Sequence, residues 1–447
     1  MWATLPAAAA DLAGREIAQL AGNVPRAAMV WPIPPRSCLI RAMAKLRASP
    51  GKTPEDRLRR ASKAVAADRS AEAERLLRPL IGKRLSMEDQ AALGALLGQL
   101  DHPKAAEELA KAETAIAKAD PGSASDQFAA ARALSLMGRN AAALDALSRC
   151  LSLDPTLAEA GMLALRLYLL QDDPDAAIAA LEPVFSGLRD PRRMILNAAK
   201  ALGVAGHAGP ALTLLSRLQT GAEDPEVSFI AAGLEGRDAD RQSAMAEAIF
   251  DGFAESYDAN LAKIDNNGPA MIGTLLTSIG PGKARVLDAG CGTGLCAPIL
   301  RPHARELVGC DISIPMLEQA KAKRGYDALL RSDLGAPATL PPGPFDLIIA
   351  ADVMTYFGDL TPVLQGLVGI MSPGAWLIFT VEEAQDGPPH SLSPTGRYKH
   401  TAKGVGDMMT AAGLTRPKQM HRDRLRTEFG DPVQGLALAA QKLALFG

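Results

Sequence analysis

The sequence contains little cysteine, few aromatic residues and no long apolar run. Its five cysteines are scattered at 38, 150, 291, 296 and 310, a spacing that fits neither a disulfide framework nor a zinc site. We therefore expect no bound metal and a reducing compartment. No apolar run reaches about 18 residues, and the start of the chain lacks the basic flank of a signal peptide. The chain is thus expected to be cytoplasmic, with no membrane segment.

An excess of charge is also missing. The 48 basic and 50 acidic residues leave a net charge of −2, so neither nucleic acid nor an anionic membrane is expected as a partner. The exception is residues 36–84, where fourteen Lys or Arg face five Asp or Glu. This stretch is interpreted as a solvated helix face, with docking of an acidic partner as the alternative. The 447 residues are enough for two or three domains.

Residues 54–220 are rich in Ala and Leu with a helical period, and the pattern repeats. Ala143, Ala177 and Ala211 occupy matching places 34 residues apart, and weaker units centre on Ala106 and Ala73. A 34-residue period is typical of tetratricopeptide repeats, in which each unit is a pair of helices that pack closely through small residues. The pattern predicts about five helical hairpins in an α-solenoid. A single irregular helical bundle is the alternative.

A solenoid of this kind presents an extended concave face, because each unit contacts only its neighbours. We expect that face to bind a protein or peptide partner, or to make a homo-oligomer. The Ala- and Pro-rich segment 1–53 is predicted to be poorly ordered. Residues 221–245 are interpreted as a linker or a last helix pair, and residues 246–447 as a second domain.

Val286 to Gly294 reads V-L-D-A-G-C-G-T-G and predicts a strand, a tight turn and a helix. Glycine lets a ligand approach the backbone closely, and a helix start offers unpaired amide groups. A dinucleotide fingerprint needs a third glycine where Leu295 stands. Asp288, just before the turn, suits an ammonium or sulfonium better than a pyrophosphate. The turn therefore predicts a cationic nucleoside cofactor.

Acids also follow the next three apolar runs, at Asp311, Asp333 and Asp352. Asp311 comes about 20 residues after the turn, where an acid at a strand end can accept both hydroxyls of a ribose. The alternation of strands and helices predicts a parallel sheet covered on both faces. The last two strands are too close in sequence for a crossover helix and must pair antiparallel. Seven strands are predicted: 284–289, 307–311, 327–331, 345–351, 375–382, 416–427 and 433–443.

These motifs resemble those of the class I S-adenosylmethionine-dependent methyltransferases. The resemblance rests on D-A-G-C-G-T-G, on G-C-D-I-S followed by Met316, on S-D-L, and on F-D-L-I-I-A-A-D-V. The whole chain is similar to a bacterial group in which tetratricopeptide repeats precede such a domain. In that group a segment like 250–258 precedes the core, and one like Gly396-Arg397-Tyr398-Lys399-His400 follows the fifth strand. The resemblance implies a Rossmann-like domain with a mixed seven-stranded sheet and a C-terminal antiparallel hairpin.

The resemblance also implies a set of residues that bind S-adenosylmethionine. The glycine turn would lie against the methionine part, with Asp288 near its ammonium group and Asp311 on the ribose. Ile312 and Met316 would flank the adenine, and Asp333 with Leu334 would contact its edge. The full set of expected cofactor residues is Asp288, Gly290, Cys291, Gly292, Gly294, Asp311, Ile312, Met316, Asp333, Leu334 and Asp352. Cys291 is interpreted as a small residue of the turn rather than as a nucleophile.

Methyl transfer needs little acid–base help beyond positioning, although a protonated nucleophile requires a base. Five residues are candidates for catalysis: Tyr257, Asp352, Tyr356, Glu382 and His400. Asp352 follows a strand end that faces the expected crevice, but it could equally cap the next helix. Arg397, Tyr398 and His400, from the G-R-Y-K-H segment, are candidates for binding the substrate, with a bland surface loop as the alternative.

The sequence therefore predicts an enzyme that methylates a peptide, a protein or a carrier-bound metabolite recruited by the repeats. A non-catalytic scaffold that keeps the fold is the alternative. A dinucleotide oxidoreductase is a third hypothesis, which Leu295 and the predicted C-terminal hairpin disfavour.

Overall fold

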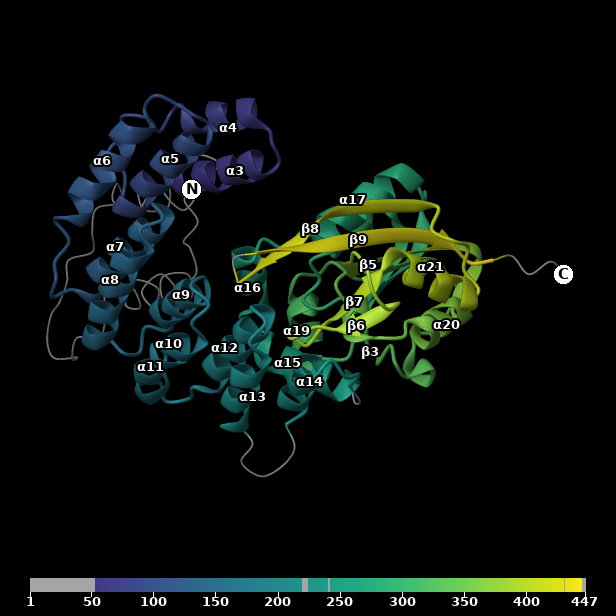
Figure 1. Ribbon diagram of the computed structural model, residues 1–447. Helices are drawn as coiled ribbons and strands as arrows, with labels where there is room; N and C mark the ends of the chain where they lie inside the picture. The colour runs from purple at the N-terminus through teal and green to yellow at the C-terminus, as the bar shows by residue number, and fades with distance from the viewer. Residues whose placement is uncertain (1–52, 219–223, 240–241, 430, 444–447) are drawn as a thin grey trace, which may run out of the picture. The chain divides into compact units, whose positions relative to one another are not determined.

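The computed structural model describes residues 53–218, 224–239, 242–429 and 431–443, and Figure 1 traces them from purple to yellow. The predicted N-terminal segment lies outside the described residues except for Thr53. Contacts divide the chain into two compact units that meet between Lys111 and Ala112, and each is described by itself. The predicted domain limits of 220 and 246 stay predictions. Among the described residues, no helix is both long and apolar enough to cross a lipid bilayer.

The first unit consists of helices that pack as pairs around a leucine core. Its helices are α3 (Pro54–Ala66), α4 (Ser70–Leu77), α5 (Met87–Gln99) and the start of α6 (Ala105–Ile116). The hydroxyl groups of Thr53 and Ser86 accept the N–H groups of Asp56 and Asp89, both at 3.1 Å, and so begin α3 and α5. Such caps satisfy amide groups that a helix start leaves unpaired.

The helix pairs continue into the second unit. Its helices before the sheet domain are α7 (Ala124–Leu136), α8 (Asn140–Leu153), α9 (Ala158–Leu169), α10 (Pro174–Ala179), α11 (Glu182–Gly187), α12 (Arg192–Val204), α13 (Ala208–Ser216) and α14 (Pro225–Leu234). Ala143, Ala177 and Ala211 are each the fourth residue of α8, α10 or α13, and all three are fully buried. The predicted arrangement of paired helices is confirmed, and their assignment as tetratricopeptide repeats stays a prediction.

The alignment of one repeat on Ala106 is wrong. Ala106 is exposed, and the fourth residue of α6 is Glu108, which lies 35 residues after Ala73 and 35 before Ala143. Glu108 is fully buried and accepts hydrogen bonds from Gln90 and from the backbone of Gly82. A buried carboxylate with hydrogen-bond partners thus takes the place of the small residue. A repeat pattern defined by alanine does not include it.

The second unit continues into a mixed sheet of nine strands. The strands are β1 (Ala284–Ala289), β2 (Ala304–Asp311), β3 (Ala328–Arg331), β4 (Phe345–Ala350), β5 (Met371–Ala384), β6 (His390–Leu392), β7 (Tyr398–Thr401), β8 (Gln419–Glu428) and β9 (Asp431–Gln441). Their order is β3-β2-β1-β4-β5-β7-β6, and β9 pairs with both β5 and β8. The first five strands are parallel, whereas β8 and β9 form the predicted antiparallel hairpin. All seven predicted strands are present.

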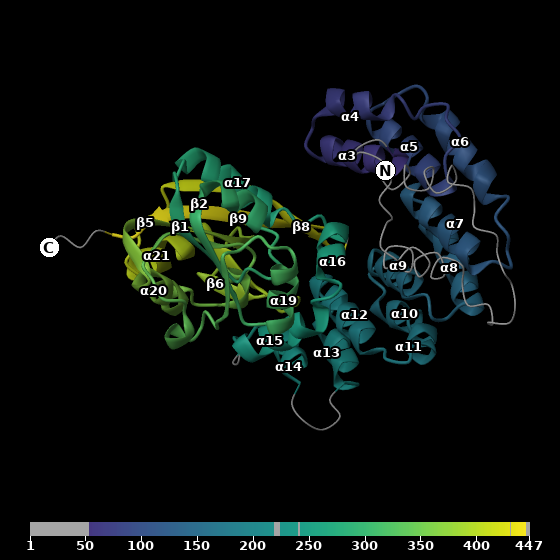
Figure 2. The same ribbon diagram turned by 180° about the vertical axis from the view of Figure 1, so that it is seen from behind.

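Neighbouring residues of each strand face opposite sides of the sheet, as the two-residue period requires. Val286 and Leu347 belong to the core under α17 (Gly268–Ile279) and α18 (Ala297–Leu300). Leu287 and Ile348 belong to the core under α20 (Thr361–Gly369) and α21 (Ala402–Ala411). Figures 1 and 2 show α17 and the α20–α21 pair on opposite sides of the sheet.

One feature differs from the predicted fold. The G-R-Y-K-H segment, for which a surface loop was the alternative, forms β7, whose residues 399–401 pair with 382–384 of β5.

A short break separates α16 (Tyr257–Lys263) from α17. At the break, Asp265 has a φ of 55°, and the side chain of Asn266 turns inward to the end of β4. The break therefore carries a side chain into the region of the predicted site.

Candidate functional site

The glycine turn joins the ends of β1 and β2. The N–H groups of Gly290 and Cys291 both donate to the carbonyl oxygen of Cys310, at 2.8 and 2.9 Å. Gly290 has a φ of +72°, and a Cβ atom there would come within 2.3 Å of a methyl group of Val353. Only glycine satisfies both conditions at this position. The turn is thereby held open toward a cavity at the carboxyl ends of the strands.

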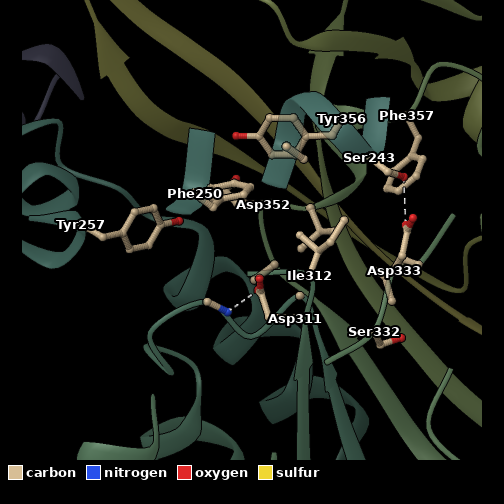
Figure 3. Close-up of a pocket in the computed structure, with 16 residues that line it drawn as sticks. Ser243, Phe250, Tyr257, Asp311, Ile312, Ser332, Asp333, Asp352, Tyr356 and Phe357 are labelled. Atoms are coloured by element: carbon tan, nitrogen blue, oxygen red, sulfur yellow. Dashed lines mark hydrogen bonds between the residues drawn. The ribbon is translucent and has the colours of Figure 1, made fainter. Parts of the chain in front are cut away.

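The four strand-end acids gather at this edge because β3, β2, β1 and β4 are neighbours in the sheet. Gly290, Gly292, Asp311, Ile312, Asp333 and Leu334, all predicted cofactor residues, line one cavity together with Asp352. A smaller adjoining cavity is lined by Asp288, Cys291 and the same two glycines. Figure 3 shows Asp311, Ile312 and Asp333 along one wall and Asp352 across from them. Seven predicted cofactor residues therefore line one cavity, and their role in binding the cofactor stays a prediction.

Asp311 accepts two backbone N–H groups, from Gly292 at 2.8 Å and from Ser313 at 2.9 Å. Burial raises the pKa of Asp311, and these two hydrogen bonds oppose that rise. A carboxylate has about four lone-pair positions, so two remain for the hydroxyls of a ribose. Asp288 is 1% exposed and accepts the hydroxyl of Tyr326 at 2.7 Å. Both acids fit the adenosyl cofactor that the resemblance implies.

Helix α15 (Gln242–Phe253) covers the cavity as a lid. Ser243 and Asp251 lie on one face of α15, eight residues apart, and each bonds to the sheet edge. The Ser243 hydroxyl donates to Asp333 Oδ1 at 2.9 Å, and the Ser313 hydroxyl donates to Asp251 Oδ1 at 2.6 Å. Between them, Glu247 pairs with Arg331 at 2.6 Å. We call these three pairs the lid contacts. Ser243, Ala246 and Phe250 of α15 line the cavity.

A second, more polar cavity of about 260 Å³ adjoins the first. The two share Phe250, Tyr257, Asp352 and Tyr356. The ring of Phe250 packs edge-on against Tyr257 and Tyr356, with centroids 6.1 and 5.4 Å apart, and Figure 3 shows the three rings side by side. We call these four residues the neck. The neck therefore lies where the two cavities adjoin.

The far wall of the second cavity comes from the helical part of the chain. Arg193, Asn197 and Lys200 of α12 line it, as does Glu226 of α14. Gly233 of α14 packs against the segment before β7, and a Cβ atom there would lie 2.3 Å from the Ser393 carbonyl oxygen. Helix α14 is therefore held tightly against the sheet domain. Sequence reasoning missed this wall, because Arg193 and Glu226 stand 97 and 64 positions before Gly290 and carry no local sign of the contact.

Asp352 at the neck has a strained backbone and a half-satisfied carboxylate. Its φ is +58°, and its N–H donates to Thr380 Oγ1 at 2.8 Å. Oδ2 accepts the side-chain amide of Asn266, whereas the buried Oδ1 has no hydrogen-bond partner among the described residues. Burial raises the pKa of Asp352, against the effect of Arg426 and Asn266. A strained acid with an unsatisfied oxygen is typical of a functional site.

Five other predicted site residues do not line either cavity. Met316 is fully buried beneath the cavity floor, and Gly294 packs on Tyr326. Tyr398 belongs to a small core with Phe229 of α14. The last two, Glu382 and His400, are buried on β5 and β7. Their predicted roles as cofactor, substrate or catalytic residues stay predictions, and their positions outside the two cavities do not support these roles.

The pKa values help to sort the candidate bases. Burial lowers the pKa of His400 to about 4, and its Nε2 bonds to the Gly358 carbonyl oxygen at 2.9 Å. His400 is therefore a neutral core residue near pH 7. Burial also raises the pKa of Tyr257 and of the Cys291 thiol, so both stay protonated. Asp352 is the candidate at the neck that can accept a proton, and Arg397 is the predicted substrate residue that lines the second cavity.

Comparison with known proteins agrees with this arrangement. A family model described as a methyltransferase domain matches residues 287–377. The malonyl-[acyl-carrier protein] O-methyltransferase of Salmonella typhimurium is 33% identical over 135 residues, which cover 30% of this chain and 51% of that protein. The human methyltransferase-like protein 27 is 37% identical over 171 residues, covering 37% of this chain and 66% of that protein.

The chain thus spans about half the length of the first of these relatives. Among solved structures, the magnesium protoporphyrin IX methyltransferase of Synechocystis PCC 6803 with bound SAH is similar at 16% identity. That match covers 45% of this chain and 99% of that structure, with a TM-score of 0.35.

Proposed function

Because the C-terminal part of the chain is a class I S-adenosylmethionine-dependent methyltransferase domain, we propose that the protein methylates an acceptor bound in the second cavity. The observation that carries this proposal is the neck. Phe250, Tyr257, Asp352 and Tyr356 line both cavities, so an acceptor in one can reach a cofactor in the other. Reacting groups held at this junction need mainly proximity and orientation.

Asp311 would hold the ribose of S-adenosylmethionine, and Asp288 would balance the positive charge of its ammonium group. When bound, the cofactor supplies a methyl group on a cationic sulfur, which keeps the electron pair of the broken carbon–sulfur bond. The aromatic rings of Phe250, Tyr257 and Tyr356 exclude water from the neck. Tyr257 stays protonated and can donate a hydrogen bond, whereas Asp352 Oδ1 can accept the proton of a nucleophile.

The helical part is proposed to present the acceptor, which would be a peptide, a protein or a carrier-bound metabolite. Residues of α12 and α14 line the cavity that the acceptor would enter, which supports a direct role for this part. The name of the Salmonella relative describes an acceptor bound to a carrier protein. Binding of a separate protein partner, or of a second copy of this chain, stays a prediction.

Calorimetric titration of the purified chain with S-adenosylmethionine, S-adenosylhomocysteine and NAD tests the proposal. We expect micromolar binding of the first two and none of NAD. Binding must be followed by transfer of a tritiated methyl group to material in a cell extract. Cofactor binding without transfer would contradict catalysis and favour the scaffold alternative, and binding of NAD alone would overturn the cofactor assignment.

A further inference from the structure

The second cavity contains more buried charge than a general binding groove needs. Its charged lining residues are Arg193, Lys200, Arg397 and Arg426, with Glu226, Asp352 and Glu428. Most of them pair with one another: Glu226 contacts Arg193 at 2.9 Å and Lys200 at 3.3 Å, and Arg397 contacts Glu428 at 2.7 Å. Charges removed from water persist only when they are compensated. A buried polar group of this lining that has no hydrogen-bond partner therefore indicates which group a ligand would supply.

Arg426 is the first exception. Its side chain is only 4% exposed, and Nη2 donates to Glu382 and, at 3.4 Å, to Glu428 Oε2. The Nε–H group is buried and has no acceptor among the described residues. A buried guanidinium N–H without an acceptor is rare, because it loses its bond to water and gains none. Because Arg426 lines the second cavity, an oxygen atom of a ligand bound there could supply the missing acceptor.

Asp352 Oδ1, at the neck, is the second exception. It is a buried acceptor without a donor, and Arg426 acts on its charge. A ligand that satisfies both groups needs a donor for Asp352 and an acceptor for Arg426. Because Asp352 lines both cavities, the donor belongs at the end of the ligand that lies next to the cofactor.

A negatively charged acceptor group suits Arg426 better than a neutral one. Arg426 pairs with Glu382 and Glu428 through Nη2, so its Nε–H still lacks an acceptor among the described residues. An anionic oxygen at this N–H would form a charge-assisted hydrogen bond, which is stronger than a bond to a neutral oxygen. At about 260 Å³, the cavity encloses a small group rather than a folded domain.

We propose that the acceptor is a hydroxy- or amino-carboxylic acid, whose carboxylate accepts Arg426 Nε–H and whose nucleophile donates to Asp352 Oδ1. This inference rests on the proposed function, because it takes the second cavity as the acceptor site. The lone pair of the hydroxyl or amine forms the new bond to the methyl carbon, and the proton of the nucleophile passes to Asp352. The acid can be free or attached to a carrier by another group, since both sources present the same chemistry.

The test uses the full chain, methyl-tritiated S-adenosylmethionine and an extract of the organism that encodes the protein. The extract is divided by ultrafiltration, and half of each fraction is treated with a carbodiimide and methylamine, which convert carboxylates into amides. We expect labelled product from a mock-treated fraction and at least tenfold less after amidation. Label in the small-molecule fraction indicates a free acid, and label in the retained fraction a carrier-bound one.

Arg426→Lys provides the matching variant, since it keeps a charge toward Glu382 but loses Nε–H. We expect at least a tenfold higher KM for the labelled acceptor, with cofactor binding unchanged. Arg422→Gln, on the same strand, is the control; its partner is Glu383, its side chain is 56% exposed, and its KM should stay within twofold. Undiminished labelling after amidation, or an unchanged KM in a folded Arg426→Lys protein, would overturn this inference and leave the proposed methyl transfer intact. Absence of label from every untreated fraction would instead contradict the proposed methyl transfer.

Discussion

The hydroxyl of Tyr326 donates to Asp288 Oδ2 at 2.7 Å, beneath the glycine turn. Tyr326 stands after α19 (Ile314–Ala322), and Asp288 is near the end of β1. Despite this hydrogen bond, burial raises the pKa of Asp288 to about 7, and the charge of Asp311 adds to the effect. Asp288 is therefore an acid whose charge changes within the range in which enzymes are assayed.

The first prediction concerns pH. A cationic cofactor favours the ionised form of Asp288, so affinity for S-adenosylmethionine should fall roughly five- to tenfold between pH 7.5 and pH 6. At pH 6 binding should release up to one proton, measured by calorimetry in buffers with different ionisation heats. Asp288→Asn should bind with little pH dependence over this range, and an unchanged profile in that variant would refute the assignment.

The same raised pKa affects stability. Because the folded state holds the proton more tightly than the unfolded state, stability falls as pH rises through about 7. Asp288→Asn should therefore raise the melting temperature, relative to the wild type, more at pH 8 than at pH 5.

Gly290→Ala should abolish cofactor binding. The added Cβ would lie 2.3 Å from Val353, at a φ of +72° that costs an alanine about 1 kcal/mol or more. Gly273→Ala is the control, because a Cβ there meets its nearest neighbour, Ile299, at 4.0 Å inside α17. That change should stabilise the protein by about 0.5 to 1 kcal/mol. Equal cofactor affinity of the two variants, by calorimetry, would show that the turn does not form the cofactor site.

Loss of a lid contact should speed cofactor release. Asp251→Ala removes the acceptor of the Ser313 hydroxyl, a charge-assisted hydrogen bond that contributes about 1.5 kcal/mol or more. We expect roughly a tenfold rise in Kd, mainly through the dissociation rate measured by stopped flow. Asp407→Ala, which removes an exposed ion pair with Lys403 on α21, should leave both constants unchanged. A slower dissociation in Asp251→Ala would contradict a closing role for α15.

Glu226→Gln should weaken the packing of α14 against α12. Glu226 is 3% exposed and pairs with Arg192, Arg193 and Lys200. Removing its charge takes away the carboxylate partner of the largely buried Lys200, which should lower the free energy of unfolding by about 2 to 4 kcal/mol in urea denaturation. Glu182→Gln breaks the half-exposed pair with Arg217 and should cost less than about 1 kcal/mol. Equal losses in the two variants would show that burial at Glu226 has no special effect.

The sheet and the cofactor crevice could be predicted because their signals are local. Each of the first four strands is an apolar run that ends at or near an acid, and neighbouring parallel strands bring these acids together without further information. The glycine turn is likewise defined by consecutive residues. The hairpin followed from the short connection between β8 and β9 alone.

The second cavity could not be predicted, because tertiary packing decides its residues. Arg426 follows Arg422 and Arg424 in an alternating strand, a pattern that resembles a solvated face, yet Arg426 is buried while Arg422 is exposed. His400 and Tyr398 were chosen for their residue type, but the pairing of β7 with β5 places both in the core. Residue type indicates what chemistry is available, and only the fold decides which side chains meet a ligand.

Phe429, at the tip of the β8–β9 hairpin, lines the second cavity and also packs against the helical core. The hairpin belongs to the sheet domain, whereas α12 contributes the opposite wall. On the proposed assignment, selection can therefore alter the choice of acceptor by exchanging one helix pair, while the residues around the cofactor stay as they are. For the same reason, a destabilising substitution in the helical part would lower turnover, although the glycine turn would be unchanged.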